Sequence, residues 1–236
     1  MIANTDDLPG VPVDVNNYYE FFTSPDGGHW CDEEIDILYN PTRHRLLNRI
    51  DKIAEADYDY LITIFTGHGE EAKDGTVLAI NGEDETITLD DLTNLSQKQL
   101  LIIDCCRGIA LMPKEKAFQK AGATMLSMSR DPIRQAYEDR IMAASPQEII
   151  LFACEEGEPA GEDPEDGGAY SYYLLRAVRM VATNSHSPFV SVSRAHRKAA
   201  SLMRRDPSVY QHPQILQSCY TDQHQRLPLA INPNLW

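Results

Sequence analysis

Two apolar segments that end in glycine-bearing turns constrain the fold of this chain more than any other feature. Residues 61–65 read LITIF and lead into TGHG at 66–69, and residues 100–103 read LLII and lead into DCCRG at 104–108. Short, β-rich apolar runs of this kind are typical of buried strands in a parallel sheet that is covered on both faces. In open α/β sheets, functional groups gather beyond the carboxyl ends of the strands. The sequence therefore predicts that one strand brings a histidine, and a later strand a cysteine, to the same edge of a sheet.

The rest of the chain alternates helical and extended patterns, which is typical of an α/β fold. Helices are expected at 14–22, 41–57, 89–95, 131–145, 169–181 and 190–205. Further strands are expected at 2–4, 34–38, 76–80, 86–88, 149–154 and 227–231. We therefore predict a mostly parallel central sheet with helices on both faces, in which the first strand is almost absent.

Length and charge limit the number of domains and the kinds of partner. With 236 residues, of which 42% are hydrophobic and 24% charged, the chain fits one domain over residues 1–236. The formal net charge of −15 argues against nucleic acid as a partner, because phosphate binding needs clustered Lys and Arg. The same charge permits a basic protein or peptide as a substrate.

The N-terminal residues and the cysteines indicate where the protein works. The first ten residues, MIANTDDLPG, lack the basic and apolar regions of a signal peptide, and no apolar run reaches the length of a membrane span. We therefore expect no membrane partner. Five cysteines without a CxxC pair give neither a zinc motif nor a disulfide framework. Free thiols in a reducing cytoplasm are the simplest interpretation.

The histidine and the cysteine of the two turns could act together as a base and a nucleophile. Cysteine attacks as the thiolate, and a neighbouring histidine can take its proton or lower its pKa. His68 and Cys106 can do this if their strands are neighbours in the sheet. The backbone N–H groups of Gly69 and Cys106 could then form an oxyanion hole, in which each donor contributes roughly 3–4 kcal/mol.

The order and context of these motifs resemble the caspase-like cysteine peptidases. DCCRG at 104–108 is similar to the pentad around the caspase nucleophile, and His68 lies 38 residues before Cys106. The resemblance extends to metacaspases and bacterial orthocaspases, and it covers most of the chain. The segments that carry it are LPGVPVDV at 8–15, ILYNPTR at 37–43, FAC at 152–154 and GAYSYYLL at 168–175.

The resemblance implies a caspase-like fold and a role for each residue at the sheet edge. It assigns the nucleophile to Cys106 rather than Cys105, because Cys106 directly precedes Arg-Gly, and it assigns the base to His68. Strand alternation is consistent with Cys105 as an inert thiol that faces the core.

The resemblance also implies a specificity for basic residues. Metacaspases and paracaspases bind the P1 side chain with two acids, which match Asp104 and Asp14, and a small hydroxyl position matches Thr66. An acidic pocket pairs with Arg or Lys through charge-assisted hydrogen bonds. Two structural alternatives remain open: a role of Asp14 in complementing the dipole of its helix, and a purely structural role of Asp104.

Two segments raise separate questions about cofactors and processing. Residues 155–166 contain seven acids, and metacaspase relatives often need Ca²⁺, which prefers carboxylate oxygens. Their spacing fits no EF-hand, so a solvated loop or a contribution to substrate subsites is the alternative. Residues 109–130 form an irregular segment, expected to be mobile or cleavable between two subunits. It carries Lys114, Lys116, Lys120 and Arg130, which would suit self-cleavage.

Taken with the resemblance, the sequence predicts a cytoplasmic cysteine endopeptidase of the metacaspase or orthocaspase type that acts on proteins or peptides. One alternative is a caspase-like binding or scaffold module without activity. Another is a peptidase with a different P1 preference, such as Asp or Leu. Small bacterial relatives can serve immune or cell-death systems, so a partner or activator protein of such a system is a further expectation.

Overall fold

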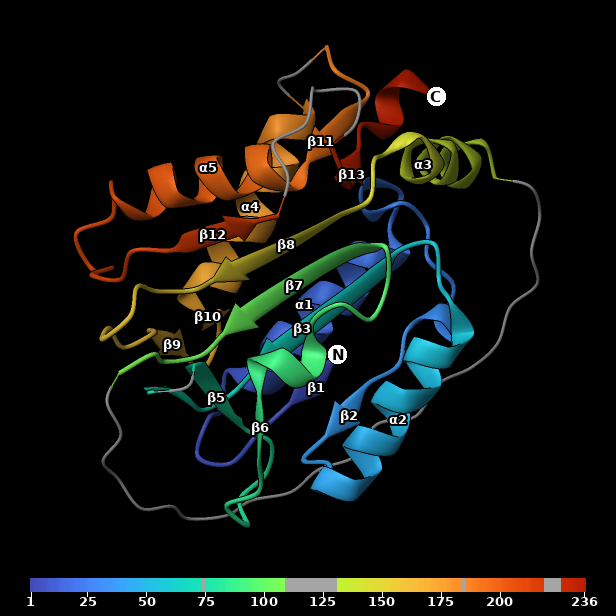
Figure 1. Cartoon of the computed structure of the whole chain (residues 1–236). Helices are drawn as coiled ribbons and strands as arrows, with labels where there is room; N and C mark the ends of the chain where they lie inside the picture. The colour runs from blue at the N-terminus through green and yellow to red at the C-terminus, as the bar shows by residue number, and fades with distance from the viewer. Residues whose placement is uncertain (74, 109–130, 184–185, 219–225) are drawn as a thin grey trace.

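The computed structural model describes residues 1–73, 75–108, 131–183, 186–218 and 226–236, and it is built around a six-stranded sheet (Figure 1). The strand order is β12 (Gln214–Gln217), β8 (Gln147–Phe152), β7 (Lys98–Asp104), β3 (Leu61–Thr66), β1 (Ile2–Ala3) and β2 (Leu38–Tyr39). Neighbouring strands are parallel except β12, which runs antiparallel to β8. The mostly parallel sheet predicted from the sequence is confirmed.

The register between β3 and β7 determines what lies at the sheet edge. These strands pair residue for residue, from Leu61 opposite Gln99 to Thr66 opposite Asp104. His68 follows the last paired residue of β3 by two positions, and Cys106 follows the last paired residue of β7 by two positions. Both side chains therefore leave the sheet at the same edge, as the sequence predicts.

The two faces of the sheet are buried against different helices. On one face, Ile64 and Ile102 belong to the same core cluster as residues of α1 (Val11–Thr23), α3 (Pro132–Ala143), α4 (Ala169–Thr183) and α5 (Val192–Met203). On the other face, Phe65 and Ile103 cluster with Leu46 and Ile50 of α2 (Arg43–Ala56). In Figure 1, α1 and α4 lie behind the sheet and α2 lies in front of it. Helices on both faces are thus confirmed.

Small antiparallel sheets complete the fold around this centre. The strands β4 (Gly69–Ala72), β5 (Gly75–Ala79) and β6 (Thr86–Thr88) form one sheet, which covers the same face as α2 through the buried Leu78 and Ile87. The other pairs are β9 (Glu162–Asp163) with β10 (Gly167–Gly168), and β11 (Phe189–Ser191) with β13 (Pro228–Ile231). Since β4 begins one residue after His68, the first small sheet fixes the backbone beside that histidine.

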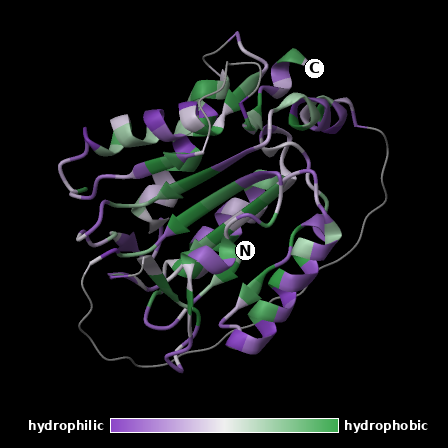
Figure 2. Ribbon diagram, in the orientation of Figure 1, coloured by the Kyte–Doolittle hydropathy of each residue, from purple (hydrophilic) through white to green (hydrophobic). Residues whose placement is uncertain are grey.

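Two of the helices, α2 and α3, begin at residues whose side chains cap them. Thr42 accepts a hydrogen bond from Arg45 N at the start of α2, and Asp131 accepts one from Ile133 N at the start of α3. Figure 2 shows hydrophilic bands along α2 and α5 against largely hydrophobic central strands. Among the described residues, no helix is both long enough and apolar enough to cross a bilayer.

The strand expected at 34–38 is wrong in most of its length. Asp32–Glu34 is a 3-10 helix, and only Leu38–Tyr39 pairs as a strand. The Glu34 carboxylate accepts a hydrogen bond from Cys31 N at 2.9 Å, which closes the turn. The neighbouring β1 has only two residues, so a longer strand at this position would have no partner for its first residues.

Other elements differ from the expectation in their bounds or in their pairing. The first helix begins at Val11 rather than residue 14, because Pro12 suits the first helical turn. The helix expected at 89–95 is a 3-10 helix over Leu89–Leu92, closed by the hydrogen bond from Thr88 N to Asp91 Oδ2 at 2.8 Å. The last expected strand forms at Pro228–Ile231, but it pairs with β11 outside the main sheet.

We predict that Ile102→Ala lowers the free energy of unfolding by about 2–5 kcal/mol, because Ile102 is fully buried in β7 and its loss leaves a cavity between the sheet and α1. The matched control is Leu216→Ala on β12, where the side chain is 55% exposed and the change should stay within about 0.5 kcal/mol. Denaturant unfolding followed by circular dichroism measures both. A loss below 1 kcal/mol at Ile102, roughly that of a surface site, would contradict this packing.

Candidate active site

His68 is held by the loop that follows β1. Its Nε2 lies 2.8 Å from the backbone oxygen of Asp6. A carbonyl oxygen only accepts hydrogen bonds, so Nε2 carries the proton and Nδ1 keeps its lone pair in the neutral ring. A neutral His68 therefore has one nitrogen fixed by the protein and the other available as a base.

The carbonyl that holds His68 is itself fixed by a buried side chain. Asn4 is fully buried, and its amide donates to Ala79 O at 2.8 Å. The amide oxygen accepts from Asp6 N at 3.1 Å, which turns the chain so that Asp6 O faces His68. The sequence interpretation missed both Asn4 and Asp6, because they act through the backbone of a short loop and belong to no motif.

Cys106 is half-buried and lies against the loop at 155–166. Ala160 N donates to Cys106 Sγ at 3.3 Å, and Sγ lies 3.7 Å from Ala160 O. The N–H group is therefore placed to stabilise a negative charge on the sulfur, while the carbonyl can accept the proton of the neutral thiol. Ala160 is a contact that the sequence interpretation did not anticipate.

The turns that follow β3 and β7 lie against each other. Gly67 N donates to Asp104 O at 3.2 Å, which joins the first turn to the second. A Cβ atom on Gly69 would lie 2.4 Å from Cys105 Sγ and 3.1 Å from Cys106 O. Only glycine fits at this position, and the residue after His68 is thereby in contact with the cysteine pair. The structure thus brings His68, Gly69 and Cys106 to one edge, as predicted.

Two further cysteines near this edge, Cys105 and Cys154, are buried, whereas Cys106 is half-buried. Cys105 is 2% exposed and belongs to the core cluster with Ile103 and Phe152. Burial, followed by the charge of neighbouring groups, holds the pKa of the Cys105 thiol well above its usual range. Burial also raises the pKa of Cys154 to about 12. Both are therefore poor nucleophiles, which agrees with Cys105 as a core thiol.

Asp14, Thr66 and Asp104 meet on the face of the sheet that α1 and α4 cover. Thr66 Oγ1 donates to Asp14 Oδ2 at 2.7 Å, and Gly168 N donates to Asp14 Oδ1 at 2.9 Å. Ser171 of α4 donates to Asp104 Oδ2 from its N at 2.9 Å and its Oγ at 2.6 Å. Asp14 is 1% exposed and Asp104 is 5% exposed. The Asp14 carboxylate thus bonds to β3 and β10 and does not face solvent at the helix start.

One glycine separates the two carboxylates. A Cβ on Gly168 would lie 2.5 Å from Asp104 Oδ2 and 3.1 Å from Asp14 Oδ2. A third acid, Glu162, accepts a hydrogen bond from Gly10 N at 2.7 Å, and its charge acts on both carboxyl groups. The sequence interpretation counted Glu162 only as part of an acidic loop and missed Ser171 and Gly168, which the GAYS motif contains.

The electrostatics of this acidic pair are unfavourable in the absence of a cation. Burial, and then the charge of Asp104, raise the pKa of Asp14 to about 8. Burial also raises the pKa of Asp104 above its usual range. In the described part of the chain, no Lys or Arg side chain bonds to either carboxylate. A ligand that brings a positive charge to this site would therefore be favoured.

The acidic loop at 155–166 uses most of its carboxylates within the protein. Glu156 bonds to Arg107 at 3.2 Å, and Glu158 bonds to His212 at 2.7 Å. Asp163 accepts from the backbone N of Glu165 at 2.7 Å. Within the described residues, no group of three or more His, Cys, Asp or Glu side chains is arranged to hold a metal ion. The contact of Ala160 with Cys106 fits the alternative in which this loop helps to form the substrate site.

Arg107 links the nucleophile's turn to both neighbouring segments. Its guanidinium lies 2.8 Å from Glu71 Oε2 on β4 and packs 4.1 Å above the Phe152 ring. Arg107 N donates to Glu158 O at 3.0 Å, and Gly157 N donates to Arg107 O at 2.8 Å. With a residue exposure of 4%, this arginine holds the acidic loop against the turn that carries Cys106.

The buried acid pair predicts an unusual pH dependence of stability. Between its ordinary pKa of 3.8 and about 8, the folded Asp14 carboxyl keeps a proton that the unfolded chain has lost. The folded state then binds more protons, so the contribution of Asp14 to the free energy of unfolding falls as pH rises from about 4 to about 8.

We therefore expect the free energy of unfolding of Asp14→Asn to fall less than that of wild type between about pH 4 and about pH 8. Chemical denaturation at several pH values in this range measures the difference. The exposed Asp51→Asn on α2 is the control and should follow the wild type. An identical pH dependence of wild type and Asp14→Asn would contradict the raised pKa.

Comparisons with known proteins place this geometry in a family context. A family model described as "Caspase domain" matches residues 2–224. The comparison with curated proteins found no match. Chains of solved structures do match, 223 of them. One is the crystal structure of Caspase-1 from Spodoptera frugiperda, with a TM-score of 0.58 and 17% sequence identity over 88% of this chain and 79% of that chain. At this identity, the structural likeness concerns the fold.

Proposed function

The chain belongs to the caspase domain family, whose members are cysteine peptidases, and from this premise we propose that it is a cysteine endopeptidase that cuts proteins after Arg or Lys. The observation that carries the specificity is the buried pair of Asp14 and Asp104, which has no cationic partner among the described side chains. The pair lies at the strand edge that also presents Cys106. The caspase-like fold and the family support the peptidase chemistry.

In the proposed reaction, His68 Nδ1 takes the thiol proton of Cys106, and the thiolate attacks the carbonyl carbon of the scissile bond. The C–N bond breaks, the leaving amine receives the proton from His68, and an acyl thioester remains on Cys106. Water then gives a proton to His68 and attacks the thioester, which releases the carboxylic acid product and restores the thiol. The hydrogen bond from His68 Nε2 to Asp6 O supports this assignment of the base.

The N–H groups of Gly69 and Cys106 are the proposed donors to the oxyanion. Each such donor contributes about 3–4 kcal/mol when it is fixed in place before the reaction. The close contact of Gly69 with Cys105 and Cys106 supports its role, because a fixed backbone can meet a developing charge without rearrangement.

A guanidinium or ammonium group is the cation that the acidic pocket would accept. Charge-assisted hydrogen bonds to Asp14 and Asp104 would return both carboxyls to their ionised forms and relieve their mutual repulsion. Thr66 and Ser171 hold the carboxylates in place for this contact, and the charge of Glu162 adds to the attraction.

The two rival functions are less well supported. A scaffold module without activity has no need of the Asn4–Asp6 turn, which fixes one nitrogen of His68. A preference for Asp at P1 would bring a third carboxylate against two buried acids. A preference for Leu would leave both acids without a countercharge.

The test compares fluorogenic peptides that differ only at P1, with Arg, Lys, Asp or Leu. We expect turnover after Arg and Lys, loss of all turnover in Cys106→Ala, and a large rise in KM for the Arg peptide in Asp104→Asn. Removal of one buried partner of a charge pair costs about 3–5 kcal/mol, which corresponds to roughly a hundredfold or more in kcat/KM. The exposed Asp51→Asn should behave as wild type.

Each other outcome of this assay points to a different function. Turnover of only Asp or Leu peptides would retain the peptidase and refute the acidic pocket. No turnover of any peptide, with and without a purified activator, would favour the scaffold. The reactions are run with and without Ca²⁺, because calcium dependence also stays a proposal.

We further expect slow self-cleavage within 109–130, a segment that lies outside the described residues. Lys114, Lys116, Lys120 and Arg130 are the candidate sites for an enzyme with basic specificity. Prolonged incubation of wild type should give two fragments on a denaturing gel, whereas Cys106→Ala stays intact. A single intact band for wild type would refute this expectation. A cytoplasmic location and a partner in an immune or cell-death system remain predictions.

A further inference from the structure

The positive charge of this acidic protein is concentrated on one pair of helices. Residues 169–205, which include α4 and α5, contain seven Lys and Arg residues and neither Asp nor Glu. Subtracting these seven charges from the net charge of −15 leaves −22 on the rest of the chain. The segment is therefore a cationic region in a strongly anionic molecule.

The basic residues of the two helices lie at their outer surface. Arg176 and Arg179 on α4 and Arg197 on α5 are exposed, and Lys198 is half-buried. In Figure 1, α5 lies at the outside of the molecule beyond β12, and Figure 2 shows hydrophilic bands along it. We call this the α4–α5 face.

A cavity of about 500 Å³ opens on the α4–α5 face. Its lining combines two half-buried apolar residues with a polar, basic rim: Met180, Val181, Arg194, Arg197, Lys198 and Ser201. The cavity thus offers an apolar surface for one side chain, surrounded by positive charge.

Helix stability does not account for the position of these charges. On α4, no basic residue lies in the last turn, so the favourable interaction of cations with the C-terminal end of the helix dipole does not explain Arg176 and Arg179. On α5, Arg194 lies in the first turn, near the end of the helix that disfavours positive charge. The basic residues Arg176, Arg179 and Arg194 therefore do not lie where the helix dipoles favour positive charge.

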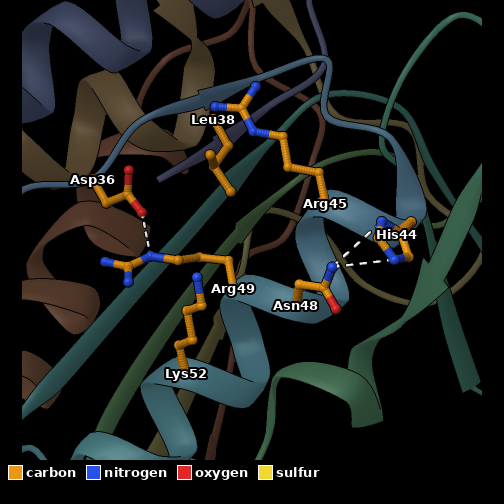
Figure 3. A pocket seen from close by; sticks show the side chains of 7 residues that line it. All are labelled: Asp36, Leu38, His44, Arg45, Asn48, Arg49 and Lys52. Carbon is orange, nitrogen blue, oxygen red and sulfur yellow. Dashed lines mark hydrogen bonds and ion pairs between the residues drawn. The ribbon is translucent and has the colours of Figure 1, made fainter.

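A second basic groove in the protein has a simpler explanation. Arg45, Arg49 and Lys52 of α2 line a cavity of about 390 Å³ beside β2, and Arg49 bonds to Asp36 at 2.5 Å (Figure 3). The same helix carries Asp51 and Glu55, which reduce its charge. Because β2 is an edge strand, charged side chains beside it prevent pairing with other chains. The α2 groove is thus a suitable control for ligand binding at the α4–α5 face.

We propose that the α4–α5 face binds an acidic segment of a partner protein that places one apolar side chain against Met180 and Val181. The α4–α5 face is small, and the rest of the chain carries a net charge of −22. A long polyanion such as nucleic acid, or a planar anionic membrane, would extend beyond the face and be repelled by this net charge. A short acidic peptide can remain within the face. This binding does not depend on the proposed peptidase activity.

The test uses the full chain and a fluorescently labelled peptide of glutamates that flank a central leucine. We expect saturable binding that weakens as salt rises, and no binding of the same peptide built from glutamines. The variant R197E/K198E should bind about tenfold more weakly, since two ion pairs become repulsive. The matched variant R45E/K52E, which makes the same charge change in the α2 groove, should bind like wild type.

The apolar contact is tested separately. Val181→Ser should weaken binding of the leucine peptide but leave unchanged the binding of a peptide with serine in place of leucine. Circular dichroism melting checks that each variant is folded. The neutral pair R197Q/K198Q, which is gentler on the fold, should bind with intermediate affinity.

Several results would overturn the proposal. These are the absence of saturable binding to the glutamate peptide, equal affinity in R197E/K198E, and equally tight binding of single-stranded DNA or of phosphatidylserine vesicles. Self-association in analytical ultracentrifugation that disappears at high salt and in R197E/K198E would identify a second copy of the chain as the occupant instead.

Discussion

The parallel pairing of β3 with β7 places the imidazole of His68, the thiol of Cys106 and the carboxyl group of Asp104 at one edge of the sheet. Side chains alternate between faces along a strand, so Ile102 and Asp104 face α1 and α4, whereas Ile103 and Cys105 face α2. A slip of one residue in the register would send Asp104 into the apolar face and separate it from Asp14. The burial of all seven residues of β7 makes such a slip costly, because it would exchange apolar and polar side chains.

The buried pair of Asp14 and Asp104 lowers the stability of the folded state. Two carboxyl groups are removed from water on either side of Gly168, and hydrogen bonds from Thr66, Gly168 and Ser171 offset only part of the loss. The cationic ligand that we propose for this site would offset the cost, because it would supply the countercharge that both carboxyl groups lack. Sites that bind strongly are often strained in this way before the ligand arrives.

The sequence was informative where function depends on strand ends and on local motifs. Apolar runs followed by glycine turns were enough to predict the central sheet and the convergence of His68 with Cys106 on one edge. The residues that support them were not predictable in this way. Asp6 and Ala160 act through backbone atoms, and Glu162 reaches the pocket from a separate two-stranded sheet, so neither local pattern nor composition identifies them. Very short strands such as β2 were misplaced because two residues carry almost no periodicity.

The brevity of β1 has a consequence for how the protein would lose activity. Ile2 and Ala3 are its only residues, and the turn that follows holds the imidazole of His68 in place. Only two residues of β1 pair with each neighbouring strand, so local opening here breaks fewer hydrogen bonds than opening of the longer strands. Gentle heating could therefore release the histidine while β3, β7 and β8 remain intact. Loss of the proposed activity would then precede melting, because the protein would still look folded by spectroscopy after His68, the proposed base, had left its position.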